Sequence, residues 1–151
     1  RSSLVGSEMC IRDRYWPNAE RYGFSMIRDF NRGTVGWTDW NLLLDQTGGP
    51  NHVSNFCFAP IHGDTSTGEL IYTPTYYYIG HFSKFVGPDS VRISTSVSRN
   101  VVLATSFLNP DGTMATIVMN KSNDSINYSF FLNDRQVDLT IPPRAMQTLV
   151  Y

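Results

Sequence analysis

The spacing of apolar residues changes at Ser90, and this change divides the chain into two kinds of structure. After Ser90, apolar and polar residues alternate, as they do in strands with one buried face. The alternating runs are separated by turn-forming residues, so they predict an antiparallel sheet or sandwich. The runs are residues 91–97, 101–108, 113–119, 126–132, 137–141 and 145–151. Before Ser90 the apolar spacing is that of helices and of a buried strand, which predicts an α/β arrangement.

Two helices and one strand are predicted in this first part. Residues 15–33 place their apolar side chains on one helical face and end at Gly33, a suitable left-handed cap. Residues 34–44 follow at once and have the apolar content of a buried strand. The long segment 45–73 is rich in turn formers, with a short apolar strand expected at 56–61. Residues 75–86 then predict a second helix, aromatic nearly all round, in which we expect His81 to pack and hydrogen-bond rather than bind a ligand.

The composition is that of an ordinary folded domain. The chain is 41% hydrophobic and 13% aromatic, which is enough for a core and argues against disorder throughout. Its net charge of -1 argues against a nucleic-acid partner, which would favour a basic surface. No apolar run reaches the length of about 18 residues that a membrane span needs. The two cysteines, Cys10 and Cys57, do not make a disulfide framework.

The predicted strand 34–44 carries an unusual group of polar and aromatic side chains, in the order Trp37, Asp39, Trp40 and Asn41. Indole rings need a partner for their N–H when buried, so two of them beside a carboxylate suggest a purpose. One interpretation is that both tryptophans fill the core beneath a loop. The other is a polar and aromatic rim at the carboxyl end of a strand, where α/β barrels build their sites.

From about Trp16 to Tyr151 the chain resembles the C-terminal part of glycoside hydrolase family 30, the glucosylceramidase family, and its matching blocks come in the same order. The blocks are Trp37-Thr38-Asp39-Trp40-Asn41, Gly48-Gly49-Pro50-Asn51, Asn55-Phe56 and Gly80-His81-Phe82-Ser83-Lys84-Phe85. The resemblance implies a (β/α)8 TIM barrel carrying a β-sandwich, and retaining hydrolysis of β-glycosides. Residues 15–88 would then be the C-terminal part of the TIM barrel and residues 89–151 the antiparallel β-sandwich domain. The rest of the barrel would be the intramolecular partner of this fragment.

The resemblance also implies a set of sugar-binding residues. Trp40 would line the glucose pocket, Asn55 would reach the sugar, and Phe56 would be its apolar neighbour. Asp39 is a further substrate-binding candidate, although a carboxylate beside a pocket equally suits support of the strand. Cys57 departs from the lysosomal enzyme, which leaves the aglycone side open. The substrate would be a β-glucoside or glycolipid.

No catalytic residue is expected in this chain. Retaining glycosidases need two carboxylates about 5 Å apart. The family carries them as glutamates on barrel strands four and seven, upstream of the part that shares the resemblance. No metal and no cofactor is implied, and the fragment alone should be inactive.

Residues 1–14 differ from the rest of the chain. They have neither a helical nor a strand period, and they resemble a translated sequencing adapter, so we leave them out of the fold prediction. Glu8, between Ser7 and Cys10, mimics the family's nucleophile motif. It lies closer to Trp37 than the family's usual interval, so we interpret it as part of the adapter-like segment.

Two other functions remain open at this point. One is a non-catalytic carbohydrate-binding or domain-linking β-sandwich module, which would have no use for the α/β residues 15–86. The other is an endo-acting glucanase or xylanase of the same clan. The compartment is undetermined, since family members are secreted, periplasmic or lysosomal. Three glycosylation sequons, beginning at Asn120, Asn123 and Asn127, are equally explained as turn residues.

Overall fold

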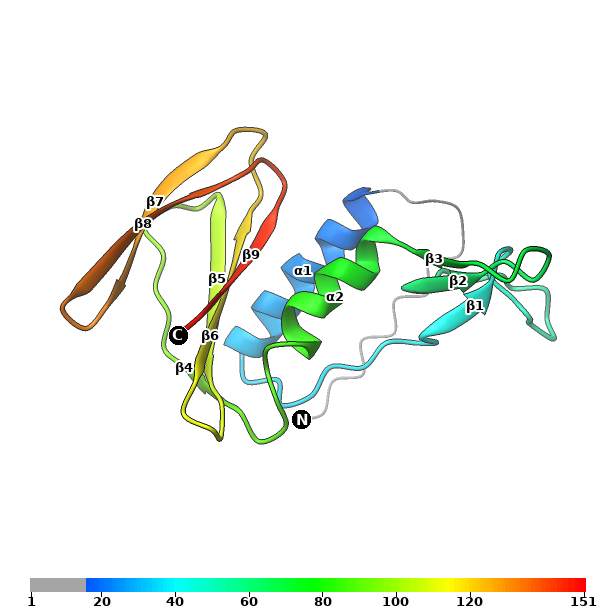
Figure 1. The fold of residues 1–151 in the computed structure, drawn as a ribbon, viewed down its shortest axis with the longest axis horizontal. Helices are drawn as coiled ribbons and strands as arrows, with labels where there is room; N and C mark the ends of the chain where they lie inside the picture. The colour runs from blue at the N-terminus through cyan, green and yellow to red at the C-terminus, as the bar shows by residue number, and fades with distance from the viewer. Residues whose placement is uncertain (1–15) are drawn as a thin grey trace. The chain divides into compact units, whose positions relative to one another are not determined.

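The computed structural model describes residues 16–151, and these form two compact units. The first unit ends at Gly80 and the second runs from His81 to Tyr151. The first contains α1 (Trp16–Asn31), β1 (Leu43–Asp45), β2 (Ile61–Gly63), β3 (Leu70–Tyr72) and most of α2 (Pro74–Ser83) (Figure 1). The second contains β4 (Val91–Ile93), β5 (Val102–Leu108), β6 (Met114–Asn120), β7 (Ile126–Leu132), β8 (Arg135–Ile141) and β9 (Met146–Val150). Among the described helices, none is long and apolar enough to cross a membrane.

The first helix forms and ends as predicted. Its buried residues, Ala19, Gly23, Met26 and Ile27, are three or four positions apart or adjacent, and so share one face. Two backbone hydrogen bonds close its end, from Gly33 N–H to the Phe30 carbonyl and from Thr34 N–H to the Asp29 carbonyl, each at 3.1 Å. This pair of bonds is the Schellman arrangement, and Gly33 adopts the expected positive φ of 94°. The helix therefore delivers the chain into residues 34–42 in a fixed direction.

The predicted strand 34–44 is mostly wrong. Only Leu43–Asp45 is a strand, and the residues before it form an irregular segment in which Val35 is 93% exposed and Leu42 is 69% exposed. The reason is pairing, because a buried parallel strand needs a neighbour on each side. Within the described part of the chain, β1 lies at the edge of a three-stranded sheet with the order β1-β2-β3 and pairs only with β2. The segment contains the apolar residues that suggested a strand, but most of them are exposed.

The return strand is displaced from its predicted position. The strand was predicted at 56–61, but β2 spans Ile61–Gly63. It pairs in parallel with β1 and antiparallel with β3.

The second helix, predicted at 75–86, begins at Pro74 and ends at Ser83. The ring of Trp16 on α1 meets that of Tyr78 on α2 edge-on, with centroids 5.7 Å apart. This contact ties the two helices together within the first unit.

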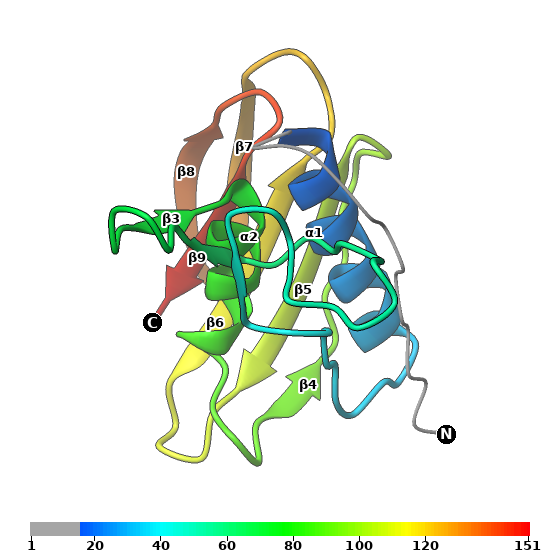
Figure 2. The same ribbon diagram turned by 90° about the vertical axis from the view of Figure 1, so that its right-hand side faces the viewer.

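All the strands predicted after Ser90 are present in the second unit. Four of them form an antiparallel sheet with the order β4-β5-β6-β9, and β7 and β8 form a separate hairpin (Figure 2). The first is shorter than expected, because residues 94–101 leave the sheet and are mainly exposed. A core of buried residues joins the sheet to the hairpin, made by Val102, Ala104, Val118, Ile126 and Ile141. This is the antiparallel β-sandwich that the alternating pattern indicated.

His81 has the structural role expected of it. Its Nδ1 lies 2.8 Å from the hydroxyl of Thr148 on β9, within the second unit. Burial lowers the pKa of its imidazole below the ordinary value. Among the described residues, no group of histidine, cysteine or acidic side chains could hold a metal ion.

Candidate functional site

The sequence-predicted site residues lie in two segments of the first unit. Asp39 and Trp40 belong to the irregular segment between α1 and β1, and Asn55 and Phe56 belong to the loop between β1 and β2. Because β1 begins at Leu43, Trp40 precedes a strand and does not stand at the carboxyl end of one, as the sequence had suggested. The residues are therefore positioned by loops, and the contacts that hold those loops decide the geometry of the site.

The side chain of Asp39 is held by a residue of α1. The hydroxyl of Tyr22, on α1, donates a hydrogen bond to Asp39 Oδ1 at 3.2 Å. Burial raises the pKa of the Asp39 carboxyl, and hydrogen bonds from the Trp40 backbone N–H and from Tyr22 oppose that rise. The other carboxylate oxygen, Oδ2, is buried and has no hydrogen-bond partner among the described residues. Tyr22 was not predicted as a site residue, since its position in the helix pattern marks it only as part of the apolar face.

The two tryptophans have different surroundings. Trp37 is partly buried, and its ring meets that of Tyr22 edge-on with centroids 5.5 Å apart. Its indole Nε1 is buried without a partner in the described part of the chain. Trp40 is 73% exposed, so the interpretation of both indoles as core residues is wrong for Trp40. Asn41, which follows it, takes a positive φ of 61°.

The loop that carries Asn55 and Phe56 is fixed where it leaves β1. The carboxylate of Asp45 accepts hydrogen bonds from the Thr47 hydroxyl at 2.6 Å, the Thr47 N–H at 2.8 Å and the Gly49 N–H at 2.9 Å. These bonds, the Thr47 hydroxyl first, lower the pKa of Asp45. Cys57 N–H donates to the Gly48 carbonyl at 2.9 Å, which brings the far part of the loop back to its start. The loop is thus closed on itself just after Phe56.

Close packing at two glycines shapes the same loop. Gly48 has a φ of 91°, and a Cβ added there would collide with the carbonyl oxygen of Cys57. A Cβ at Gly49 would lie 3.1 Å from the Phe56 ring, so that ring rests against the glycine. Phe56 is nevertheless 41% exposed, and Asn55 beside it is exposed. Both side chains therefore remain available on the surface of a constrained loop.

His62 on β2 anchors the end of this loop. Its Nε2 accepts a hydrogen bond from the Ala59 N–H at 3.2 Å, which makes Nδ1 the protonated nitrogen. Nδ1 lies 2.7 Å from the Asp45 carbonyl oxygen, to which it can then donate. One imidazole therefore joins β1, β2 and the last residues of the loop between them.

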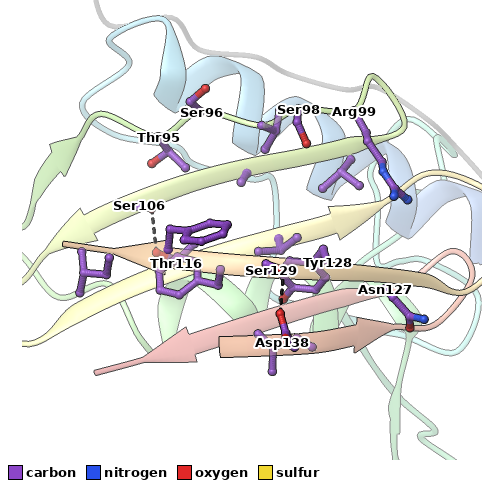
Figure 3. A pocket seen from close by; sticks show the side chains of 18 of the residues that line it. Thr95, Ser96, Ser98, Arg99, Ser106, Thr116, Asn127, Tyr128, Ser129 and Asp138 are labelled. Atoms are coloured by element: carbon purple, nitrogen blue, oxygen red, sulfur yellow. Dashed lines mark hydrogen bonds between the residues drawn. The ribbon is translucent and has the colours of Figure 1, made fainter. Parts of the chain in front are cut away.

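The second unit contains a separate hollow of about 1020 Å³ between the four-stranded sheet and the β7–β8 hairpin (Figure 3). Several of its hydroxyl groups already have hydrogen-bond partners within the protein. Ser106 and Thr116 lie 2.7 Å apart, and Ser129 donates to Asp138 at 2.7 Å. None of the sequence-predicted site residues lines this hollow.

Two family models together match almost the whole chain. Residues 4–86 match the glycosyl hydrolase family 30 TIM-barrel domain, and residues 89–149 match the glycosyl hydrolase family 30 beta sandwich domain. The chain belongs to glycosyl hydrolase family 30, and its two units carry parts of a TIM barrel and a β-sandwich, as the sequence predicted. The barrel match begins inside residues 1–14, and the adapter interpretation of that segment stays a prediction. Glu8 also lies outside the described residues.

Individual relatives agree with this assignment. The chain is 35% identical to the lysosomal acid glucosylceramidase of Mus musculus over 133 residues, which are 82% of this chain and 26% of that protein. The crystal structure of SrfJ from Salmonella typhimurium matches with a TM-score of 0.89 and 33% identity, covering 98% of this chain and 33% of that one. The endo-β1,6-glucanase BT3312 matches with a TM-score of 0.75 and 28% identity, covering 85% of this chain and 30% of that one. The chain spans about a quarter of the length of the curated relatives it matches.

Proposed function

We propose that this chain supplies part of the sugar-binding shell of a retaining β-glucosidase that resembles glucosylceramidase. The family membership supports glycoside hydrolysis, and the 35% identity to a lysosomal acid glucosylceramidase supports a β-glucoside or glycolipid as substrate. The observation that carries the site is the exposed indole of Trp40, next to a carboxylate held by α1. An exposed indole offers an apolar face for the C–H groups of a sugar and one N–H donor.

Asn55 and Phe56 complete the proposed shell. The amide of Asn55 can both donate and accept hydrogen bonds with sugar hydroxyls, and the Phe56 ring gives an apolar neighbour. Their loop is held by Asp45 and Gly48, so the two side chains are ordered before a sugar arrives. Such preorganisation lowers the entropy lost on binding. The intramolecular partner of this shell would be the remainder of the barrel.

The catalytic step itself needs groups that we do not assign to this chain. In a retaining mechanism one carboxylate attacks the anomeric carbon and the other protonates the leaving oxygen, the two lying about 5 Å apart. We expect the 151-residue chain alone to release no product from an aryl β-glucoside. Turnover that disappears in a Glu8→Gln variant would contradict this expectation and the adapter interpretation together.

The sugar-binding role is tested with Trp40→Ala in the full-length enzyme that carries this segment. Because Trp40 is 73% exposed, its truncation should cost less than about 1 kcal/mol of folding stability. Loss of the sugar contact should lower kcat/KM by tens- to hundreds-fold, roughly 2–3 kcal/mol. Melting temperature and kinetics are measured on the same preparation.

Trp37→Ala is the matched control. Trp37 is partly buried against Tyr22, so this change should lower stability more than Trp40→Ala does, with smaller kinetic loss in the folded fraction. A Trp37→Ala enzyme that is stable and inactive, beside a Trp40→Ala enzyme that is unfolded, would mean that the two roles are reversed.

The rival activities are separated by substrate. The likeness to an endo-β1,6-glucanase supports a second candidate, in which the same shell holds a polysaccharide. An enzyme that cleaves β1,6-glucan or xylan and leaves a β-glucoside untouched would favour it. A non-catalytic carbohydrate-binding module has no hydrolysis to lose, so binding without any turnover in the full-length protein would favour that function instead.

A further inference from the structure

The indole of Trp40 is 73% exposed, so few packing contacts of the ring fix the segment that carries it. Asn41, which follows, takes a positive φ of 61°, a left-handed conformation that asparagine adopts more readily than most residues. The position of the Trp40 backbone therefore depends on how the preceding residue, Asp39, is anchored.

Asp39 itself is held by α1. The Tyr22 hydroxyl donates to Asp39 Oδ1 at 3.2 Å, and the Tyr22 ring is in turn held edge-on by Trp37. Tyr22 lies on a helix whose neighbouring residues Gly23 and Met26 are buried, so its position is set by the packing of α1. A chain of contacts therefore runs from the helix to Asp39, the residue that directly precedes Trp40.

The carboxylate has little to offer a substrate directly. Oδ1 accepts the hydrogen bond from Tyr22, and Oδ2 is buried. A sugar hydroxyl needs an accessible oxygen to bond. The geometry favours support over substrate binding for this residue.

We propose that Tyr22 and Asp39 are a positioning pair, in which the Tyr22 hydroxyl holds the Asp39 side chain and so fixes the chain at the residue before Trp40, whose indole is presented to the sugar. This proposal rests on the proposed function, because it takes Trp40 as the residue that contacts the sugar. Asp39 and Tyr22 act through Trp40 and are not themselves in contact with substrate.

Tyr22→Phe tests the pair in the 151-residue chain by nuclear magnetic resonance. The change removes the hydroxyl and keeps the ring against Trp37. We expect the backbone amide resonances of Trp40 and Asn41 to shift, because the Asp39 side chain that precedes them is no longer held. Tyr77→Phe, the same change at a tyrosine on α2 that is 57% exposed, should leave both resonances in place. Unmoved Trp40 and Asn41 amides in a folded Tyr22→Phe chain would overturn the proposal.

Asp39→Asn provides a second variant if Tyr22→Phe does not fold. The amide keeps one oxygen for Tyr22 but makes a weaker acceptor than the charged carboxylate. It should move the same two resonances in the same direction by a smaller amount. A folded Asp39→Asn chain with unchanged resonances would likewise overturn the pair.

A double-mutant cycle in the full-length enzyme separates positioning from general support. Tyr22→Phe should lower kcat/KM by about 2- to 10-fold, the size of one hydrogen bond. In a Trp40→Ala background the same change should have no further effect, because the residue it positions is gone. An equal fall in both backgrounds would overturn the positioning role.

The cycle also distinguishes this proposal from the proposed function. If Trp40→Ala leaves kcat/KM unchanged, the assignment of Trp40 to the sugar fails, while the amide shifts still decide whether Tyr22 and Asp39 hold its backbone. If Trp40→Ala lowers kcat/KM and the Tyr22→Phe effects add independently, the sugar assignment stands and the positioning pair fails.

Discussion

The two units differ in how far each completes its own structure. In the second unit, β6 lies between β5 and β9, and Ile117, Val118 and Met119 along it are all buried. In the described part of the first, β1 has one neighbour, the parallel strand β2, and Leu42 and Leu43 are 69% and 52% exposed. The second unit contains a partner for each side of β6, namely β5, joined to it by a short turn, and β9, which comes later in the chain.

This difference explains why an apolar pattern did not lead to burial in the first unit. Val35, Trp37, Trp40 and Leu42 contributed to the predicted strand, yet within the described part of the chain residues 34–42 lie outside the sheet. The β5–β6 turn, by contrast, is stabilised locally. Asn109 N–H donates to the Thr113 carbonyl at 2.8 Å, and Asp111 accepts from the Thr113 hydroxyl at 2.7 Å. The pairing of β5 with β6 is therefore supported by hydrogen bonds within the turn that joins them.

The largest expected effect contrasts a core residue with an exposed one. Ile117→Ala, at a residue with no exposed surface, should lower the free energy of unfolding by about 3–5 kcal/mol through lost burial and a cavity. Val35→Ala, at a residue that is 93% exposed, should change it by less than about 0.5 kcal/mol. Denaturant unfolding of the 151-residue chain, followed by circular dichroism, measures both.

If Val35→Ala lowered the free energy of unfolding as much as Ile117→Ala does, the contrast drawn between the two units would be wrong. That result would mean that residues 34–42 pack in the chain as a strand does, as the sequence pattern first suggested.

An intermediate effect is expected from two glycines with the same backbone conformation. Gly48, with φ 91°, and Gly112, with φ 86°, both strain any other residue. Only at Gly48 would a Cβ also meet backbone, the carbonyl oxygen and, at 2.9 Å, the nitrogen of Cys57. Gly48→Ala should therefore cost on the order of 2–4 kcal/mol, and Gly112→Ala only about 1–2 kcal/mol.

The two substitutions should also differ in which residues they disturb. Gly48→Ala should shift the amide resonances of Asn55 and Phe56, because Cys57 closes their loop on Gly48, whereas Gly112→Ala should leave them unchanged. Equal costs for the two substitutions, with Asn55 and Phe56 undisturbed, would show that the loop does not close in this way.

The smallest expected effect is a pH dependence of opposite sign in the two units. Burial raises the pKa of Asp39, so the folded chain binds this proton more tightly than the unfolded chain. Its contribution to stability is complete below the unfolded pKa and is lost as the pH rises through the folded pKa. Hydrogen bonds from Thr113 lower the pKa of Asp111, so its contribution is present above the unfolded pKa and is lost as the pH falls through the folded one.

Melting temperatures of Asp39→Asn and Asp111→Asn, compared with the parent chain at about pH 3 and about pH 7, test these signs. Relative to the parent, Asp39→Asn should be more stable at the higher pH than at the lower, and Asp111→Asn less stable. The differences should be small, since Asp39 is only half buried and Asp111 is exposed. The same sign at both positions would contradict the assignment of either environment.

The residues of the proposed site were named from the sequence, but not how they are held. Trp40, Asn55 and Phe56 belong to blocks that resemble the family and are exposed, and their binding of a sugar stays a prediction. Tyr22 carries no such signal, because its hydroxyl meets Asp39 across seventeen positions of sequence. A helical pattern records which face a residue occupies and says nothing of a partner in a later loop. The assignment of Asp39 to the substrate was open for the same reason.

By itself, the sequence determined the elements whose stabilising contacts are local. Helix α1, its Gly33 end and the turn at Asn109 depend on neighbours within a few residues. The strands of the second unit follow from their own alternating pattern, and three of their pairings are with the next strand in sequence, while β9 pairs with the more distant β6. Tertiary structure alone decided whether residues 34–42 form a strand, which tryptophan is exposed, and what holds Asp39. Those outcomes depend on the pairing and burial of segments far apart in the chain, and the free energy of such contacts is not contained in any local pattern.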